Sequence, residues 1–135
     1  MNLPATVPGA APTGPLIFVV DDEPLIGELL NIALTNAGFR VRIFTDPAVA
    51  AEAFEEIHPK PAVLATDYTM PHMDGLELIR RCLAVEPSVR TLLFSGNITA
   101  EMYSFEQTKP QRFFAKPFTP SQFVEEVRAL LQQPR

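Results

Sequence analysis

The segment Leu16-Ile17-Phe18-Val19-Val20-Asp21-Asp22 is the most informative about the fold, because a run of apolar residues leads directly into two acids. An apolar run without alternating polar residues predicts a strand that is buried on both faces. Pro24 then suits the first turn of a helix. The apolar residues that follow recur at helical spacing and are predicted to face inward, at Ile26, Leu29, Leu30, Ala33, Leu34 and Ala37.

The same alternation of strand and helix continues along the chain. Further strands are predicted at 39–43, 62–65, 91–94 and 113–115, and further helices at 46–57, after the loop 68–74, at 99–107 and from 119 onward. In the second strand Arg40 and Arg42 alternate with apolar residues, which indicates a half-exposed strand at a sheet edge. Five strands alternating with five helices predict an α/β fold, a doubly wound five-stranded parallel sheet with helices on both faces.

Length and composition bound the classes of protein that fit. The 135 residues suit one domain, at 16–132, and the proline-rich residues 1–15 are expected to form a disordered arm. A net charge of −5 argues against direct binding to nucleic acid or to a membrane surface. The lone Cys82 cannot form an internal disulfide, and the segment before Arg40 lacks targeting features, so a cytoplasmic location is expected. Because the chain ends soon after the last predicted helix, we expect no output domain to follow it.

Polar residues stand where four of the predicted strands end. Asp21 and Asp22, Asp67, Ser95 and Lys116 each follow an apolar run directly. A single polar residue there is ordinary, because the chain is reaching the surface. Ligands of open parallel sheets, however, bind beyond the carboxyl ends of the strands, where these groups would converge. Three close carboxylates would repel one another unless a cation such as Mg²⁺ neutralised them, and the lysine would suit an anion.

The motifs around these residues resemble those of response-regulator receiver domains. They are Val20-Asp21-Asp22-Glu23-Pro24, the run from Asp67 to Gly75 (DYTMPHMDG), Ser95-Gly96 and Lys116-Pro117-Phe118, in this order. The resemblance covers about residues 16–132. It implies a flavodoxin-like, CheY-like three-layer sandwich with strand order 2-1-3-4-5.

The resemblance also implies a role for each site residue. Asp67 would be the phosphoacceptor, taking a phosphoryl group from a phosphohistidine on a sensor histidine kinase or a histidine phosphotransfer protein. Mg²⁺ would be held by Asp21, Asp22, Asp67 and the backbone carbonyl of Thr69. The phosphoryl oxygens would be contacted by Ser95 and Lys116, a switch would couple Ser95 to Phe113, and the Lys116–Pro117 peptide bond would be cis.

The function implied is a phosphorylation-switched signalling module and not an enzyme acting on a free substrate. It would bind a downstream protein through the face formed by the fourth helix, fifth strand and fifth helix, although Pro110-Gln111-Arg112 and the weak apolar stripe of 99–109 depart from the family pattern there. Three alternatives stay open. They are a phosphate-relay or sink receiver from a hybrid histidine kinase, a Mg²⁺-dependent phosphatase with an aspartyl-phosphate intermediate, and an adaptor that works without phosphorylation. Against the phosphatase, Thr69 stands where many such enzymes carry a second acid.

Overall fold

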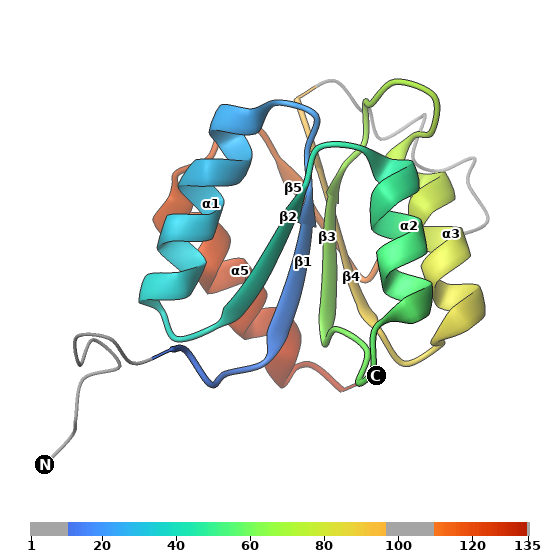
Figure 1. Cartoon of the computed structure of the whole chain (residues 1–135). Helices are drawn as coiled ribbons and strands as arrows, with labels where there is room; N and C mark the ends of the chain where they lie inside the picture. The colour runs from blue at the N-terminus through green and yellow to red at the C-terminus, as the bar shows by residue number, and fades with distance from the viewer. Residues whose placement is uncertain (1–10, 97–109, 135) are drawn as a thin grey trace, which may run out of the picture.

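A single parallel sheet forms the centre of the molecule. The structure is a computed structural model that describes residues 11–96 and 110–134. The sheet order is β2-β1-β3-β4-β5, as the resemblance implies, and every neighbouring pair is parallel. The strands, which run upward in Figure 1, are β1 (Leu16–Val20), β2 (Arg40–Phe44), β3 (Val63–Asp67), β4 (Arg90–Ser95) and β5 (Arg112–Ala115).

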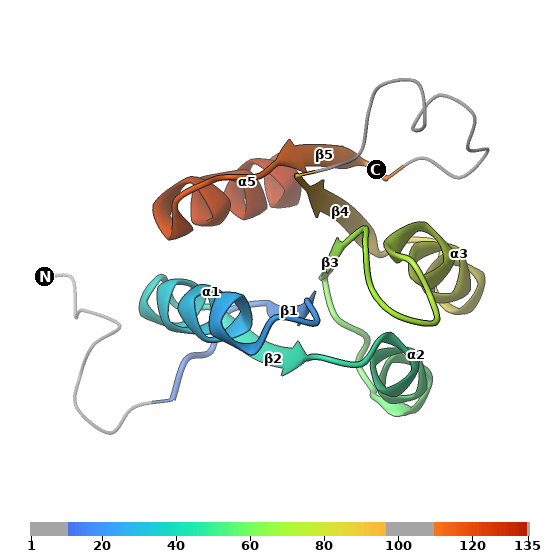
Figure 2. The ribbon, with the colours of Figure 1, turned by 90° about the horizontal axis from the view of Figure 1, so that it is seen from above.

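Helices cover both faces of this sheet and complete the predicted sandwich. Seen from above in Figure 2, one face carries α1 (Pro24–Asn36) and α5 (Pro120–Gln132), and the other carries α2 (Pro47–Glu56) and α3 (Gly75–Val85). The helix predicted at 99–107 lies outside the described residues. Within the described part of the chain, no helix combines the length and the apolar character that crossing a bilayer requires.

The apolar run of β1 is buried on both sides, which confirms the prediction for this stretch. Its residues alternate between two cores: Phe18 packs toward α2 and α3, whereas Ile17 and Val19 pack toward α1 and α5. Phe18 meets Phe54 of α2 edge to face, with ring centroids 6.0 Å apart. Burial of the central strand therefore ties both helical layers to one sheet.

Side chains at the helix starts fix where three of the loops end. Asp46 and Asp74 each accept a backbone N–H in the first turn of α2 and α3. Thr119 and Gln122 form a capping box at the start of α5, where each side chain accepts the other residue's backbone N–H. Since these loops leave the carboxyl ends of the strands, their capping defines the rim of the site.

Helix α1 carries a second apolar stripe that faces outward. The side chains of Leu25, Leu29 and Ile32 are 70%, 44% and 54% exposed and lie at positions i, i+4 and i+7; we call them the α1 stripe. The prediction that Leu29 faces inward is wrong. Leu30 and Leu34 fill the face toward the sheet, so Leu29, one residue before Leu30, is turned away from it.

Backbone contacts begin shortly before β1. The Gly14 N–H donates to the carbonyl of Gly38 at 3.0 Å, and the Arg40 N–H donates to the carbonyl of Pro15 at 3.1 Å. Gly14 must be small, because a Cβ there would stand 2.4 Å from the Gly38 oxygen. These contacts hold the entry to β1 against the start of β2.

Candidate functional site

The predicted site residues gather at the carboxyl edge of the sheet, the upper edge in Figure 1. Asp21 and Asp22 follow β1, Asp67 is the last residue of β3, and Lys116 follows β5. Because β1 and β3 are neighbours in the sheet, the two segments that carry acids leave it side by side. The parallel topology thus brings together residues that lie up to 95 positions apart in the chain.

Three carboxylates form one cluster. Asp21, Asp22 and Asp67 each place one oxygen so that all three oxygens lie within 4.8 Å of one another. Asp21 is fully buried and Asp67 is 5% exposed, whereas Asp22 is the most accessible of the three. A cluster of negative oxygens this dense and this poorly hydrated favours a bound cation.

The ammonium group of Lys116 lies against the cluster. Its Nζ donates to Oδ2 of Asp21 and to Oδ2 of Asp67, each at 3.3 Å, and the side chain is 21% exposed. The same nitrogen sits 5.5 Å from the ring centroid of Phe94 on β4. Lys116 therefore offers a positive charge directly beside the Asp67 carboxylate.

The proton affinities of these groups follow from burial and mutual charge. Burial, followed by the negative charge of Asp21, raises the pKa of Asp67 from 3.8 to about 6, and Lys116 only partly offsets this. Burial likewise raises the pKa of Asp21. Burial lowers the pKa of Lys116, but the charges of Asp21 and Asp67 outweigh it, so the net direction is upward. Burial and the charge of Asp21 thus disfavour the ionised form of Asp67, and a bound cation would favour it.

Backbone contacts hold the acids in place. Oδ1 of Asp21 accepts the N–H of Glu23 at 2.9 Å, which orients the buried carboxylate. On the loop after β3, the Gly75 N–H donates to the Tyr68 carbonyl at 2.9 Å. A Cβ at Gly75 would stand 2.3 Å from the Asp67 carbonyl oxygen, so only glycine allows this close approach. The geometry around Asp67 is thus set by its own loop.

Ser95 and Phe113 lie on neighbouring strands and on the same face of the sheet. Phe113 pairs with Leu93, and Ser95 lies two residues after Leu93 on β4. Ser95 is 3% exposed, and its carbonyl accepts the Lys116 N–H at 3.0 Å. Phe113 is 38% exposed. A side chain at the site and one at the sheet edge are therefore diagonal neighbours.

Two further features concern the remaining predicted positions. Thr69 is exposed and lies in the loop after Asp67. The Lys116–Pro117 peptide bond is cis, as is that of His58–Pro59.

The donor set of the cluster fits a hard divalent cation. Asp21, Asp22 and Asp67 offer only oxygen atoms, which Mg²⁺ and Ca²⁺ prefer to nitrogen or sulfur. The three negative charges with one adjacent ammonium leave a net negative site that a divalent ion would neutralise. The cluster can therefore hold a metal ion next to a buried carboxylate.

Glu23 is a residue of the site to which the sequence interpretation assigned no role. Its Oε1 lies 3.6 Å from Nζ of Lys116, so the lysine faces a third carboxylate. The sequence feature that could have identified Glu23 is its position directly after the Asp21-Asp22 pair, at the start of α1. The residue types alone did not distinguish it from a solvated glutamate.

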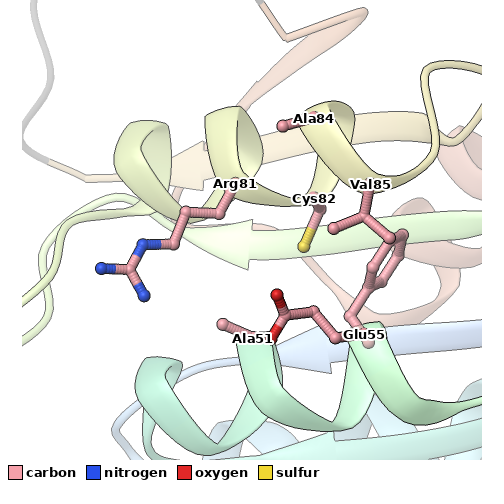
Figure 3. Close-up of a pocket in the computed structure, with 7 residues that line it drawn as sticks. Ala51, Glu55, Arg81, Cys82, Ala84 and Val85 are labelled. Atoms are coloured by element: carbon pink, nitrogen blue, oxygen red, sulfur yellow. The ribbon is translucent and has the colours of Figure 1, made fainter.

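A separate cavity of about 330 Å³ lies between α2 and α3 (Figure 3). The Cys82 sulfur and the Glu55 carboxylate point into this space from opposite helices, and Arg81 points away along α3. Burial raises the pKa of the Cys82 thiol to about 12, so the thiol stays protonated at neutral pH. The cavity shares no lining residue with the acid cluster, and Cys82 belongs to the core.

Comparisons with known proteins agree with this geometry. The response regulator receiver domain family matches residues 17–128. The chemotaxis protein CheY of Thermotoga maritima is 29% identical over 114 residues, covering 83% of this chain and 93% of CheY. The DNA-binding response regulator MtrA of Mycolicibacterium smegmatis is 30% identical over 117 residues, covering 87% of this chain and 50% of MtrA. The chain thus spans half the length of MtrA but nearly all of CheY.

The fold is shared with solved receiver structures. A CheY-like response regulator receiver domain protein from Methanospirillum hungatei superposes with a TM-score of 0.82 at 21% identity, covering 89% of this chain and 95% of that one. The family match over residues 17–128 includes the acid cluster and Lys116. The chain therefore belongs to the receiver domain family of two-component response regulators.

Proposed function

We propose that the protein is a phosphorylation-switched module in which Asp67 accepts a phosphoryl group from a phosphohistidine on a sensor histidine kinase or a histidine phosphotransfer protein. The observation that carries this proposal is the contact of one buried carboxylate with both a cation site and an ammonium group. Asp67 shares the acid cluster with Asp21 and Asp22, and its Oδ2 lies 3.3 Å from Nζ of Lys116. A carboxylate so placed can attack phosphorus while positive charge balances the transferring oxygens.

The metal of the site is proposed to be Mg²⁺. Asp21, Asp22 and Asp67 would hold it, together with the backbone carbonyl of Thr69, and water would fill the remaining positions. When bound, Mg²⁺ supplies charge neutralisation for the phosphoryl oxygens. The all-oxygen donor set supports this choice, and a bound divalent ion would favour the ionised Asp67 carboxylate that the attack requires.

The proposed transfer step forms one bond at Asp67 and breaks one bond in the phosphodonor. One oxygen of the ionised Asp67 carboxylate attacks the phosphorus and forms the new O–P bond. The P–N bond to the donor imidazole breaks, and the imidazole leaves with the electron pair and takes up a proton. Lys116 and the Ser95 hydroxyl are proposed to donate hydrogen bonds to the phosphoryl oxygens. Later attack of water on phosphorus would release phosphate, so the module turns over no free substrate apart from its phosphodonor.

The signal is proposed to leave the site through Ser95 and Phe113. A phosphoryl group adds about −1.5 to −2 charges and three acceptor oxygens. If Ser95 moves toward these oxygens, it vacates space beside Phe113, its diagonal neighbour on β5. A change in Phe113, which is 38% exposed, would alter the surface near β5 and α5 that a downstream protein contacts.

The α1 stripe is proposed to guide the phosphodonor protein. Leu25, Leu29 and Ile32 form an exposed apolar strip on α1, which begins at Pro24, two residues after Asp22. A donor that brings its histidine to Asp67 must cover the neighbouring surface, and an exposed apolar strip favours protein contact there. The cytoplasmic location expected from the sequence would expose this surface to such donors.

Phosphotransfer to Asp67 can be tested by intact mass. The chain is incubated with Mg²⁺ and acetyl phosphate, and wild type is expected to gain the mass of one phosphoryl group. Asp67→Asn is expected to gain none, and omission of Mg²⁺ is expected to abolish the gain. An unchanged gain on Asp67→Asn would refute the assignment of the acceptor. Steady hydrolysis of a generic phosphate ester would instead favour the phosphatase.

A further inference from the structure

Glu23 adds a third carboxylate to the lysine of the site, and its position differs from that of the other two. Asp21 and Asp67 approach Lys116 from the protein interior, at 3.3 Å each. Glu23 approaches to 3.6 Å with a side chain that is 65% exposed. It also lines a cavity of about 190 Å³ together with Lys116, Pro117 and Phe118. Glu23 therefore contacts the ammonium group from the side that faces solvent.

The backbone and the side chain of Glu23 have separate tasks. Its N–H donates to Asp21 Oδ1 at 2.9 Å, and its carbonyl accepts the N–H groups of Ile26 and Gly27 at 3.1 and 3.3 Å. These bonds fix the start of α1 without the carboxylate, which makes no capping hydrogen bond at this N-cap position. The carboxylate can thus be neutralised without disturbing the helix start.

The Glu23 carboxylate affects the charge around Lys116 and therefore the proposed phosphoryl transfer. One ammonium group faces the carboxylates of Asp21, Asp67 and Glu23. A phosphoryl group on Asp67 needs the same ammonium, and an anionic donor must first approach it. Glu23 competes for the ammonium and repels the donor, and both effects oppose transfer.

We propose that Glu23 is a positioning residue that restrains Lys116 in the unphosphorylated protein and thereby slows phosphorylation of Asp67. This inference rests on the proposed function. When Glu23 is neutralised, it no longer competes for the Lys116 ammonium group, which can then interact more strongly with Asp67 and with the oxygens of the incoming phosphoryl group. For a partly exposed charge at this distance, Glu23→Gln is expected to raise the rate of phosphorylation by acetyl phosphate about threefold to tenfold at low ionic strength.

The experiment compares four proteins at saturating Mg²⁺, with Mg²⁺ affinity measured separately by calorimetry. These are wild type, Glu23→Gln, Glu23→Asp and Glu28→Gln, with phosphorylation by acetyl phosphate followed by intact mass. Glu28 is exposed on α1 and has no ion pair within the described ranges, so Glu28→Gln makes the same change of net charge elsewhere. Glu28→Gln should match wild type, and Glu23→Asp, which keeps the charge, should stay near it. The gain in Glu23→Gln should shrink as salt is added, because exposed charges are screened.

The possible results distinguish a failure of the role of Glu23 from a failure of the proposed function. If wild type gains no phosphoryl mass, the proposed function fails. If wild type is phosphorylated but Glu23→Gln reacts at an equal or lower rate, the function stands and the role of Glu23 is refuted. An equal gain in Glu28→Gln, or a gain that does not respond to salt, would also refute it.

Discussion

Replacing Asp67 with asparagine is expected to stabilise the folded protein at neutral pH when no divalent ion is present. Asp67 is 5% exposed and lies beside Asp21, so its negative charge is held in an unfavourable environment. Asparagine has nearly the same shape and keeps an oxygen that can accept from Lys116, but it carries no charge. The substitution therefore removes a buried negative charge that destabilises the folded protein.

The size of this stability difference and its dependence on pH follow from the pKa of Asp67. Burial and Asp21 raise it from 3.8 in the unfolded chain to about 6 in the folded protein. The folded state thus binds the proton more tightly, and wild type loses stability as pH rises through this window. Above it the loss is about 3 kcal/mol, and below about pH 4 it vanishes. Asp67→Asn should therefore exceed wild type by up to that amount near pH 8 and by nothing near pH 4.

Urea unfolding followed by circular dichroism, at several pH values and with a chelator present, measures this difference. Glu28→Gln serves as the control, since Glu28 is exposed and lies on the helix surface. Added Mg²⁺ should stabilise wild type more than Asp67→Asn and so narrow the gap. Equal stability of the two proteins at pH 8, or a difference in stability that widens as pH falls, would show that the buried Asp67 charge does not destabilise the folded protein.

Three other experiments test separate parts of the structure. Gly75→Ala should cost about 1–3 kcal/mol of unfolding free energy by urea titration, because its Cβ would stand 2.3 Å from the Asp67 carbonyl; Gly96→Ala, with 3.6 Å to Lys116 Cβ, should cost far less. Leu29→Ser should slow transfer from a phosphorylated sensor kinase severalfold but leave the acetyl phosphate rate unchanged, and equal rates from the kinase would remove the α1 stripe from donor binding. Cys82 should resist iodoacetamide in the folded protein at neutral pH and react once urea unfolds it; rapid labelling of the folded chain would contradict its burial.

The fold could be predicted largely from local patterns. The unbroken apolar run of β1 and the alternation of β2 reflect how each strand is buried, and both patterns were sufficient to place these strands. The strand order came only from the family resemblance, because no local pattern states which strands become neighbours. The start of the last helix at residue 119 could be predicted because the capping signal depends on residues only three positions apart.

The contacts of the site were harder to predict where they depend on the direction in which a helix leaves the sheet. The convergence of Asp21, Asp67 and Lys116 followed from the rule that parallel strands end at one edge. The contact of Glu23 with Lys116 did not, because it requires the direction in which α1 starts. Leu29 was assigned inward for a similar reason: the apolar residues of α1 fit two stripes, and periodicity alone cannot choose which one meets the sheet.

Asp67 is expected to carry the phosphoryl group, and chemical trapping of the acyl phosphate tests this expectation. The protein is phosphorylated with acetyl phosphate and Mg²⁺ and then reduced with borohydride, which converts an aspartyl phosphate to homoserine. Peptide sequencing by mass spectrometry then locates the product. We predict homoserine at position 67 alone, and none when the donor or Mg²⁺ is withheld. Homoserine at position 21 or 22, or at no position in a protein shown to be folded, would contradict the account.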